Sequence, residues 1–220
     1  MSLRGVARTL GVAVAWVLAA LGAKFIDQPL SDWLAQPPRG PWLRGWLDSL
    51  AGLMVYVGVP SILLALPNWK RLFLSWNAAM LLSALLTHAL KWAVGRARPH
   101  QALGAFTYEP FSQTDHMNSF PSGHTSSAVT IALLLGLYFP RLRGVFWFFA
   151  AVVALERIVT RNHYPSDVIA GAGIGVLAVL VAWRGLGPAW FAWHEPPRAE
   201  LDAAGSAPTI DSFNESRGRT

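Results

Sequence analysis

The 220-residue chain contains no cysteine, which excludes disulfide bonds and thiolate metal sites. It is also poor in charge, because only 14% of its residues are charged, against about 25% in a typical soluble domain. The charges lie in short polar segments between long apolar runs, so there is no soluble domain and no basic helix face. The net charge of +6 therefore does not indicate nucleic-acid binding, and the composition favours a membrane protein.

Six apolar runs fill most of the first 184 residues. Each approaches the roughly 17–25 residues that a spanning helix needs, and its apolar residues are continuous rather than confined to one stripe. The predicted spans are Val6–Phe25, Ser49–Pro67, Leu72–Val94, Gly123–Phe139, Gly144–Thr160 and Pro165–Trp183. We therefore predict an all-α fold, a six-transmembrane-helix bundle over residues 1–184. Residues 185–220, rich in Gly, Pro, Ala and charge, are predicted to form a disordered cytoplasmic tail.

The start of the chain, MSLRGVARTLGVAVAWVLAALGA, also resembles a signal peptide, but LGAKF is a poor cleavage site, which favours an uncleaved first helix. The connection from Ile26 to Trp46 mixes Pro, Trp and single charges and is predicted to be an interfacial segment. The short connections NWKR and PRLR are basic and contain no acid, so the positive-inside rule predicts cytoplasmic N- and C-termini. A bacterial inner membrane is the expected location.

By alternation, four span ends then lie at the extracytoplasmic face: the end of the third, the start of the fourth, the end of the fifth and the start of the sixth. The third span ends in KWAVGRARPH, where Lys91 and Arg98 are seven residues apart and Pro99 favours a helix end. Lys91 could also be an ordinary C-terminal cation or a snorkelling side chain. Arg96 is interpreted as a solvated or headgroup-facing charge.

The fourth span begins with FPSGHTSSAV. Ser122 is a natural N-cap, Gly123 allows close backbone approach, and His124 lies in the first turn. The exposed N–H groups of a helix N-terminus bind anions, phosphate above all. Ordinary capping would explain Ser122 alone, but a cap does not require His124.

The sixth span begins with NHYPSDV. His163 and Asp167 are four residues apart, so the carboxylate can reach an imidazole nitrogen. Arg157 ends the fifth span, and a charge in the apolar slab costs on the order of 2.5–3.5 kcal/mol, so Glu156 and Arg157 are expected to face the bundle interior or the interface. Together the clusters supply three cations, an anion-binding helix end, two histidines and an acid, which is what phosphate chemistry requires.

The segments KWAVGRARP, PSGH and RIVTRNHYPSD resemble the three signatures of the type 2 phosphatidic acid phosphatase superfamily, which also contains vanadium haloperoxidases. The resemblance covers residues 91–167. It implies that phosphate is bound by Lys91, Arg98, Arg157, Ser122 and Gly123. It further implies that His163 attacks phosphorus, Asp167 holds His163 in the right tautomer, and His124 protonates the leaving oxygen and then activates water. No metal and no other cofactor are implied.

One residue departs from the family pattern, because Glu156 stands where serine usually precedes the arginine. Its carboxylate could pair with Arg157 or Lys91, or point toward helix packing, and it is not assigned a catalytic role. Because His163 must be neutral to attack and His124 must carry a proton, we predict a bell-shaped pH–rate profile.

The leading hypothesis is an integral membrane phosphatase acting on a lipid phosphate or diphosphate monoester. Undecaprenyl diphosphate, phosphatidylglycerophosphate and phosphatidic acid are the candidate substrates, with the first slightly favoured by the outer location of the site. Phosphoryl transfer between lipids, a non-catalytic lipid-phosphate binder or transporter, and haloperoxidase activity are the alternatives. The sequence does not indicate an oligomeric state.

Overall fold

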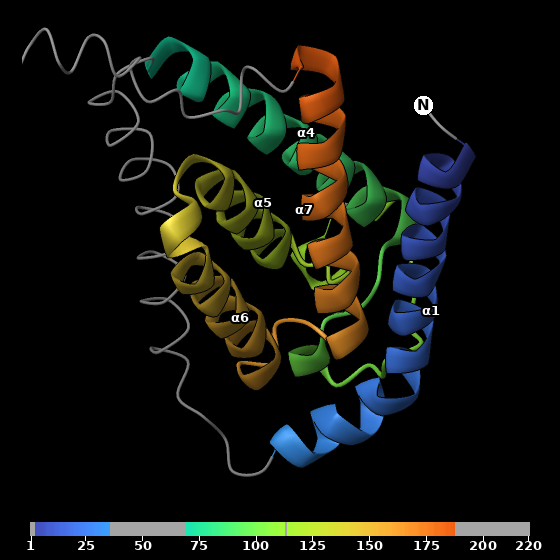
Figure 1. Ribbon diagram of the computed structural model, residues 1–220. Coiled ribbons are helices and arrows are strands. Elements are labelled where there is room, and N and C mark those ends of the chain that lie inside the picture. The colour runs from blue at the N-terminus through green and yellow to red at the C-terminus, as the bar shows by residue number, and fades with distance from the viewer. Residues whose placement is uncertain (1–2, 36–68, 113, 188–220) are drawn as a thin grey trace, which may run out of the picture.

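The computed structural model describes residues 3–35, 69–112 and 114–187 (Figure 1). In these segments the chain forms long α-helices joined by loops and short 3₁₀ turns, without a strand, which confirms the all-helical prediction. The helices are α1 (Leu3–Leu34), α4 (Trp69–Val94), α5 (Gly123–Tyr138), α6 (Arg143–Val159) and α7 (Pro165–Leu186). The span predicted at Ser49–Pro67 lies outside the described residues, as does nearly all of the predicted tail.

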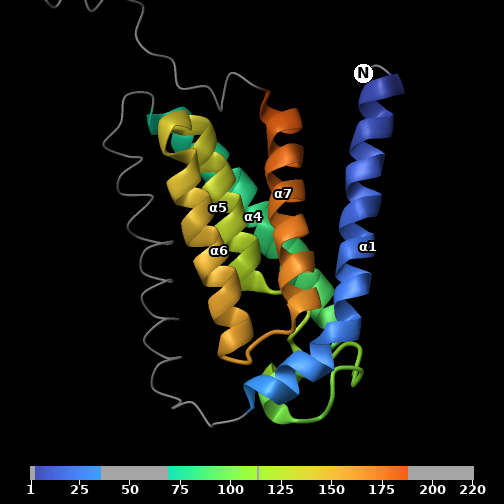
Figure 2. The ribbon, with the colours of Figure 1, turned by 60° about the horizontal axis from the view of Figure 1, so that its bottom comes forward.

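The bounds of α4, α5, α6 and α7 lie within a few residues of the predicted spans. The first helix is much longer than predicted, because it continues through Pro29 to Leu34. Its final turns cross the end of the bundle beside the loops, as Figure 2 shows. The prediction of an interfacial connection from Ile26 onward is therefore wrong over residues 26–34. A buried Asp27, described below, anchors this part of the helix.

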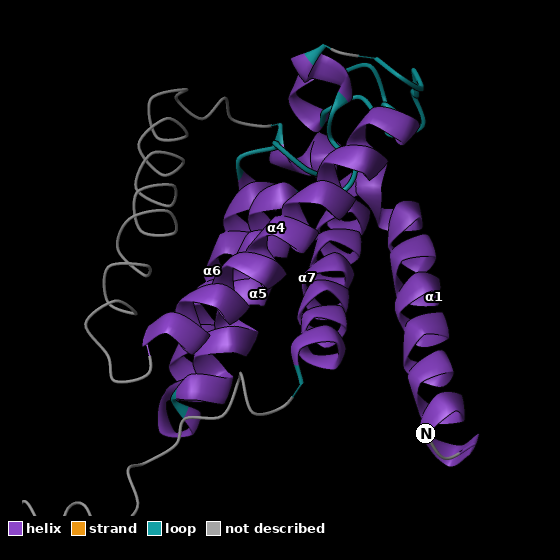
Figure 3. Cartoon of the chain, turned by 90° about the horizontal axis from the view of Figure 1, so that it is seen from above, coloured by secondary structure: helices purple, strands orange, loops and turns teal. Residues whose placement is uncertain are grey.

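Helices α5 and α7 form the centre of the bundle. α6 packs on α5, α1 packs on α7, and α4 lies against both central helices (Figures 1 and 2). The main apolar core joins α4, α5 and α7 through residues that include Leu72, Trp76, Leu134, Tyr138 and Val179. Figure 3 shows the longest loops gathered at the end of the bundle opposite the N-terminus.

The outer faces of the helices carry large exposed apolar side chains. Leu18 and Phe25 on α1 are 62% and 84% exposed, and Phe148 on α6 is 64% exposed. Among the described helices, α4 and α7 are long and apolar enough to cross a membrane, and α5 is a shorter apolar helix. An apolar exterior of this extent favours contact with lipid over contact with water.

Two glycines allow α7 to approach α5 closely. A Cβ atom at Gly171 would lie 2.3 Å from the carbonyl oxygen of Ser122, and one at Gly175 would lie 2.6 Å from the carbonyl oxygen of Ser126. Any larger residue therefore has to push the two helices apart. Because Ser122 begins α5, the contact at Gly171 also fixes the position of that helix end relative to α7.

We expect Gly171→Ala to lower the free energy of unfolding by roughly 1–3 kcal/mol, since the added methyl group overpacks a backbone contact that cannot rotate away. Gly185→Ala, on the same helix, is the matched control, because a Cβ atom at Gly185 meets nothing within 4 Å. Alanine there should be neutral or stabilising, by up to about 1 kcal/mol from helix propensity. Thermal unfolding of the two purified variants measures the difference, and equal stabilities would contradict the packing argument.

Candidate active site

The end of α4, the start of α5, the end of α6 and the start of α7 meet at one end of the bundle. The backbone N–H of Ser122 donates to the carbonyl oxygen of Asp167 at 3.0 Å, which joins the first turns of α5 and α7. Gly123 lies against α4, since a Cβ atom there would be 3.9 Å from Cε of Lys91. The helix alternation inferred from the sequence thus brings the three motif segments together.

His163 lies in the loop between α6 and α7 and is only 4% exposed. Its backbone N–H donates to the carbonyl oxygen of Arg157, 3.1 Å away, and its ring Nδ1 lies 2.6 Å from the carbonyl oxygen of Ser119. A carbonyl oxygen can only accept, so this contact assigns the proton of the neutral ring to Nδ1. Nε2 then carries the lone pair, which is the form that a nucleophile needs.

The imidazole of His163 is neutral at physiological pH. Burial lowers its pKa from 6.5 to about 4, and the positive charges of Lys91 and Arg98 act in the same direction, while Asp167 acts against them. With the pKa lowered, protonation of His163 begins only well below pH 6.5. The ring therefore stays available as a nucleophile across the neutral range.

Asp167, in the first turn of α7, is fully buried and lies 3.9 Å from Nδ1 of His163, measured at Oδ2. The shorter contacts of this carboxylate are to other donors. Oδ2 accepts from the Ser119 hydroxyl at 2.6 Å and from the Tyr164 backbone N–H at 2.9 Å, and Oδ1 accepts from Nη1 of Arg96 at 2.6 Å. Asp167 thus holds Ser119, whose carbonyl oxygen in turn holds His163.

The interpretation of Arg96 as a solvated charge is wrong, because its side chain is completely buried. Its guanidinium lies between two carboxylates, Asp167 on one side and Asp27 on the other, and 4.3 Å from the centre of the Tyr164 ring. Burial alone would lower the pKa of Arg96, but these two carboxylates outweigh burial and raise it. Two negative partners make burial of this cation possible.

Lys91 and Arg98 converge on Asn118 in the loop before α5. The Lys91 ammonium donates to the backbone carbonyl oxygen of Asn118, and the Arg98 guanidinium donates to the Asn118 side-chain oxygen through Nε at 2.8 Å and Nη2 at 2.5 Å. Two cations from different segments therefore point at one small region next to Ser119. An anion there would meet both.

Two further predicted residues surround this region. Arg157 is 3% exposed at the end of α6, and its Nε donates to the carboxylate of the adjacent Glu156. Of the interactions left open for Glu156, the structure forms the one with Arg157. His124 is the second residue of α5, and its side chain is exposed.

The start of α5 has the predicted capping geometry. The hydroxyl oxygen of Ser122 accepts from the backbone N–H of Thr125 at 3.4 Å, so Ser122 is the N-cap, and its side chain is fully buried. Gly123 is the first helical residue and packs against Thr87 and Lys91. The positive end of the α5 dipole therefore lies beside the Lys91 side chain.

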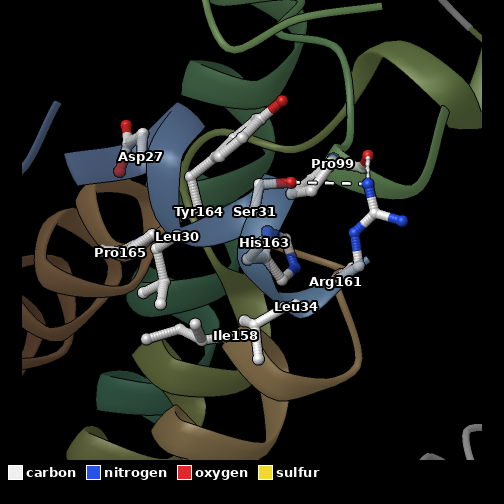
Figure 4. A pocket seen from close by; sticks show the side chains of 10 residues that line it. All are labelled: Asp27, Leu30, Ser31, Leu34, Pro99, Ile158, Arg161, His163, Tyr164 and Pro165. Carbon is white, nitrogen blue, oxygen red and sulfur yellow. Dashed lines mark hydrogen bonds between the residues drawn. The ribbon is translucent and has the colours of Figure 1, made fainter. Parts of the chain in front are cut away.

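A small pocket borders His163 on the side of α1 (Figure 4). Arg161 crosses its edge, and Nη2 of this residue donates to the carbonyl oxygen of Pro99 at 2.9 Å. The lining residues are Asp27, Leu30, Ser31, Leu34, Pro99, Ile158, Arg161, His163, Tyr164 and Pro165. The last turns of α1 thus form one wall of the site.

Sequence reasoning missed Asp27, Arg96, Asn118 and Ser119 as members of the site. Arg96 and Asp27 were both placed at the outer face by the charge pattern, but that pattern does not identify which charges pair. Asn118 and Ser119 act largely through backbone carbonyl oxygens, which any residue supplies. In the described segments, no group of three or more His, Cys, Asp or Glu side chains is placed to hold a metal ion.

Comparison with known proteins gives this arrangement a context. A lipid A 1-phosphatase of Rhizobium etli is 36% identical over 140 residues, which are 59% of this chain and 60% of that protein. Decaprenylphosphoryl-5-phosphoribose phosphatase of Mycobacterium tuberculosis is 30% identical over 163 residues, which are 72% of this chain and 82% of that protein. The matched part thus falls short of two thirds of the Rhizobium protein.

A solved structure also matches. The crystal structure of Aquifex aeolicus LpxE has a TM-score of 0.54 and 25% sequence identity, and the match covers 71% of this chain and 93% of that one. Residues 72–190, more than half of the chain, match the family model described as the PAP2 superfamily. That segment contains all three motifs whose side chains meet around His163, and the chain belongs to the PAP2 superfamily.

Proposed function

We propose that this protein is an integral membrane lipid phosphatase that hydrolyses a phosphate or diphosphate monoester through a phosphohistidine intermediate. One observation carries the proposal: a buried, neutral His163 and the cations Lys91 and Arg98 converge on the same two-residue segment, Asn118–Ser119. The family membership and the named phosphatase relatives support the same reaction class.

Binding comes first. The oxygens of Asn118 occupy Lys91 and Arg98 in this structure, and a phosphate group, with more negative charge on its oxygens, replaces them as the acceptor. Arg157 and the N-terminal amides of α5 at Ser122 and Gly123 complete the anion site. Charge on the phosphoryl oxygens is stabilised in a region largely closed to water.

In the first chemical step, Nε2 of His163 forms a bond to phosphorus while the bond to the lipid oxygen breaks, and His124 gives that oxygen a proton. In the second step, water attacks phosphorus, His124 takes its proton, and the phosphorus–nitrogen bond breaks. The Ser119 carbonyl oxygen stabilises the positive charge that develops on the ring, because it accepts the Nδ1 proton at 2.6 Å. The chain's own side chains supply every proton transfer in this scheme, which therefore requires no metal.

The proposed arrangement in the membrane has six spans over residues 1–184, a cytoplasmic tail over residues 185–220, and the reaction site at the extracytoplasmic face. The N-terminus of α1 and the C-terminal end of α7 lie at the end of the bundle opposite His163, which supports this orientation (Figure 2). The lipid tails then lie along the exposed apolar faces of the helices.

The candidate substrates are undecaprenyl diphosphate, phosphatidylglycerophosphate and phosphatidic acid, and the Rhizobium relative adds lipid A with a 1-phosphate. All four present a phosphate or diphosphate ester at headgroup level. We expect the purified full-length protein to release inorganic phosphate from at least one of them, at an unchanged rate in EDTA. The His163→Ala variant, prepared in the same way, is the blank.

Three outcomes contradict parts of this proposal. Binding of all four lipids without phosphate release, over the blank, would indicate a binder rather than an enzyme. Loss of activity in EDTA, restored by a divalent cation, would contradict the metal-free mechanism. Phosphate that moves to a second lipid instead of appearing free would identify a transferase.

A further inference from the structure

A row of three buried charges runs from α1 to the first turn of α7. Nη2 of Arg96 lies 2.8 Å from Oδ2 of Asp27, and Nη1 lies 2.6 Å from Oδ1 of Asp167, and all three side chains are 0% exposed. The carbonyl oxygen of Ala105 accepts from Nε and Nη2 of the same guanidinium, at 3.0 and 2.7 Å. Arg96 is thus held on both sides and along its edge.

Asp27 also binds α7 directly. Its Oδ1 accepts from the backbone N–H of Ser166 at 3.0 Å, and its Oδ2 accepts from the Ser166 hydroxyl at 2.5 Å. Ser166 directly precedes Asp167, so α1 fixes the first turn of α7 one residue away from the acid. Trp16, further along α1, donates to the carbonyl oxygen of Ile169 at 2.6 Å and fits against Gly173.

The charge balance of this row decides the field at His163. Two carboxylates and one guanidinium leave one negative charge, and His163 stands 3.9 Å from the end of the row at Asp167. Loss of the Asp27 charge would leave the row neutral, whereas loss of the Arg96 charge would leave it with two negative charges. The two changes therefore act on the imidazole in opposite directions.

We propose that Arg96 and Asp27 are positioning residues for the phosphatase reaction: together they set the place and the charge of Asp167 and, through it, the protonation of His163. The proposal rests on the proposed function for its catalytic meaning, and on the buried contacts for its physical content. α1 is then part of the reaction site as well as of the scaffold.

The test compares Asp27→Asn, Arg96→Gln and the double variant with the wild-type chain, all full length. Asp32→Asn is the matched control, because Asp32 is an exposed acid five residues further along α1. The protonation of His163 is followed by histidine NMR, using the resonance that a His163→Gln variant lacks. The acid limb of kcat/KM against pH is measured beside it, because it reports the free enzyme.

We expect Arg96→Gln to raise the pKa of His163, on the order of one pH unit, and Asp27→Asn to lower it. The double variant should return toward the wild-type value, and Asp32→Asn should not move it. The other charged and titratable groups around His163 are the same in all these chains: Lys91, Arg98, His124, Glu156, Arg157, Arg161 and Asp167. A purely structural role would produce shifts of the same sign, or none, in the two single variants.

If Arg96→Gln does not fold, Asp27→Asn alone decides, because it preserves shape and changes only charge. At pH 4, where the wild-type ring is about half protonated, the ring in Asp27→Asn should be clearly less protonated. An unchanged or higher protonation overturns the proposal. A wild-type chain without phosphate release would refute the proposed function instead, while the NMR titration would still test the charge row.

Discussion

His163→Ala is expected to reduce phosphate release by roughly 10⁴-fold or more, because the residue that forms the covalent bond to phosphorus is lost. Folding should survive, since the ring makes few contacts beyond the Ser119 carbonyl oxygen and the neighbouring carboxylate. The measurement is phosphate release from the best lipid of the panel. Wild-type protein quenched during turnover of a ³²P-labelled lipid should carry acid-labile label, and the variant should carry none.

His88→Ala is the control for this experiment. His88 lies on α4 one turn before Lys91, but its side chain is exposed, so its removal should leave activity unchanged. Activity above about a tenth of wild type in His163→Ala would refute the phosphohistidine mechanism, whatever the effect on binding. A similar loss in both variants would point to general damage to the bundle.

Asp167→Asn is expected to reduce both activity and stability. The amide group of asparagine has only one acceptor oxygen, yet Oδ1 of Asp167 accepts from Arg96 and Oδ2 accepts from Ser119 and Tyr164. Whichever way the amide turns, its NH₂ group faces a donor. The variant also removes one of the two carboxylates around buried Arg96, so we expect a loss of roughly 3–5 kcal/mol in the free energy of unfolding.

The activity of Asp167→Asn should fall by about 10²- to 10³-fold, less than the roughly 10⁴-fold known for the acid of a Ser-His-Asp triad. The reason is the geometry, because the tautomer of His163 is held by the Ser119 carbonyl oxygen at 2.6 Å and only indirectly by Asp167. Unfolding curves and phosphate release, both compared with Asp32→Asn, measure the two effects. Unchanged stability would contradict the buried charge row, and a larger activity loss than for His163→Ala would contradict the indirect role.

The helices were predictable because a membrane span leaves a long apolar run, and four runs agree with α4 to α7 within a few residues. The meeting of the three motifs followed from alternation of those spans. The extension of α1 was not predictable in this way, because Pro29 and three acidic or polar residues around it interrupt the apolar run. Burial of Asp27 against Arg96 and Ser166 stabilises a helix there that composition alone argues against.

The residues missed in the site share a physical reason. Arg96 and Asp27 are 69 positions apart, and each taken singly has the pattern of a surface charge at the end of a span. Only the packed structure shows that they exclude water from one another. Ser119 and Asn118 act through carbonyl oxygens whose direction depends on backbone torsion angles, and those are not encoded by residue type in a readable way.

The contribution of α1 also limits how this protein can be taken apart. The family segment begins at residue 72, so an excised fragment or a chimera built on that boundary would contain every signature and yet omit Asp27. Its arginine would then be enclosed with half of its counter-charge. Exchange of the leading helix between relatives should preserve turnover only where the donor helix presents a carboxylate at the same depth.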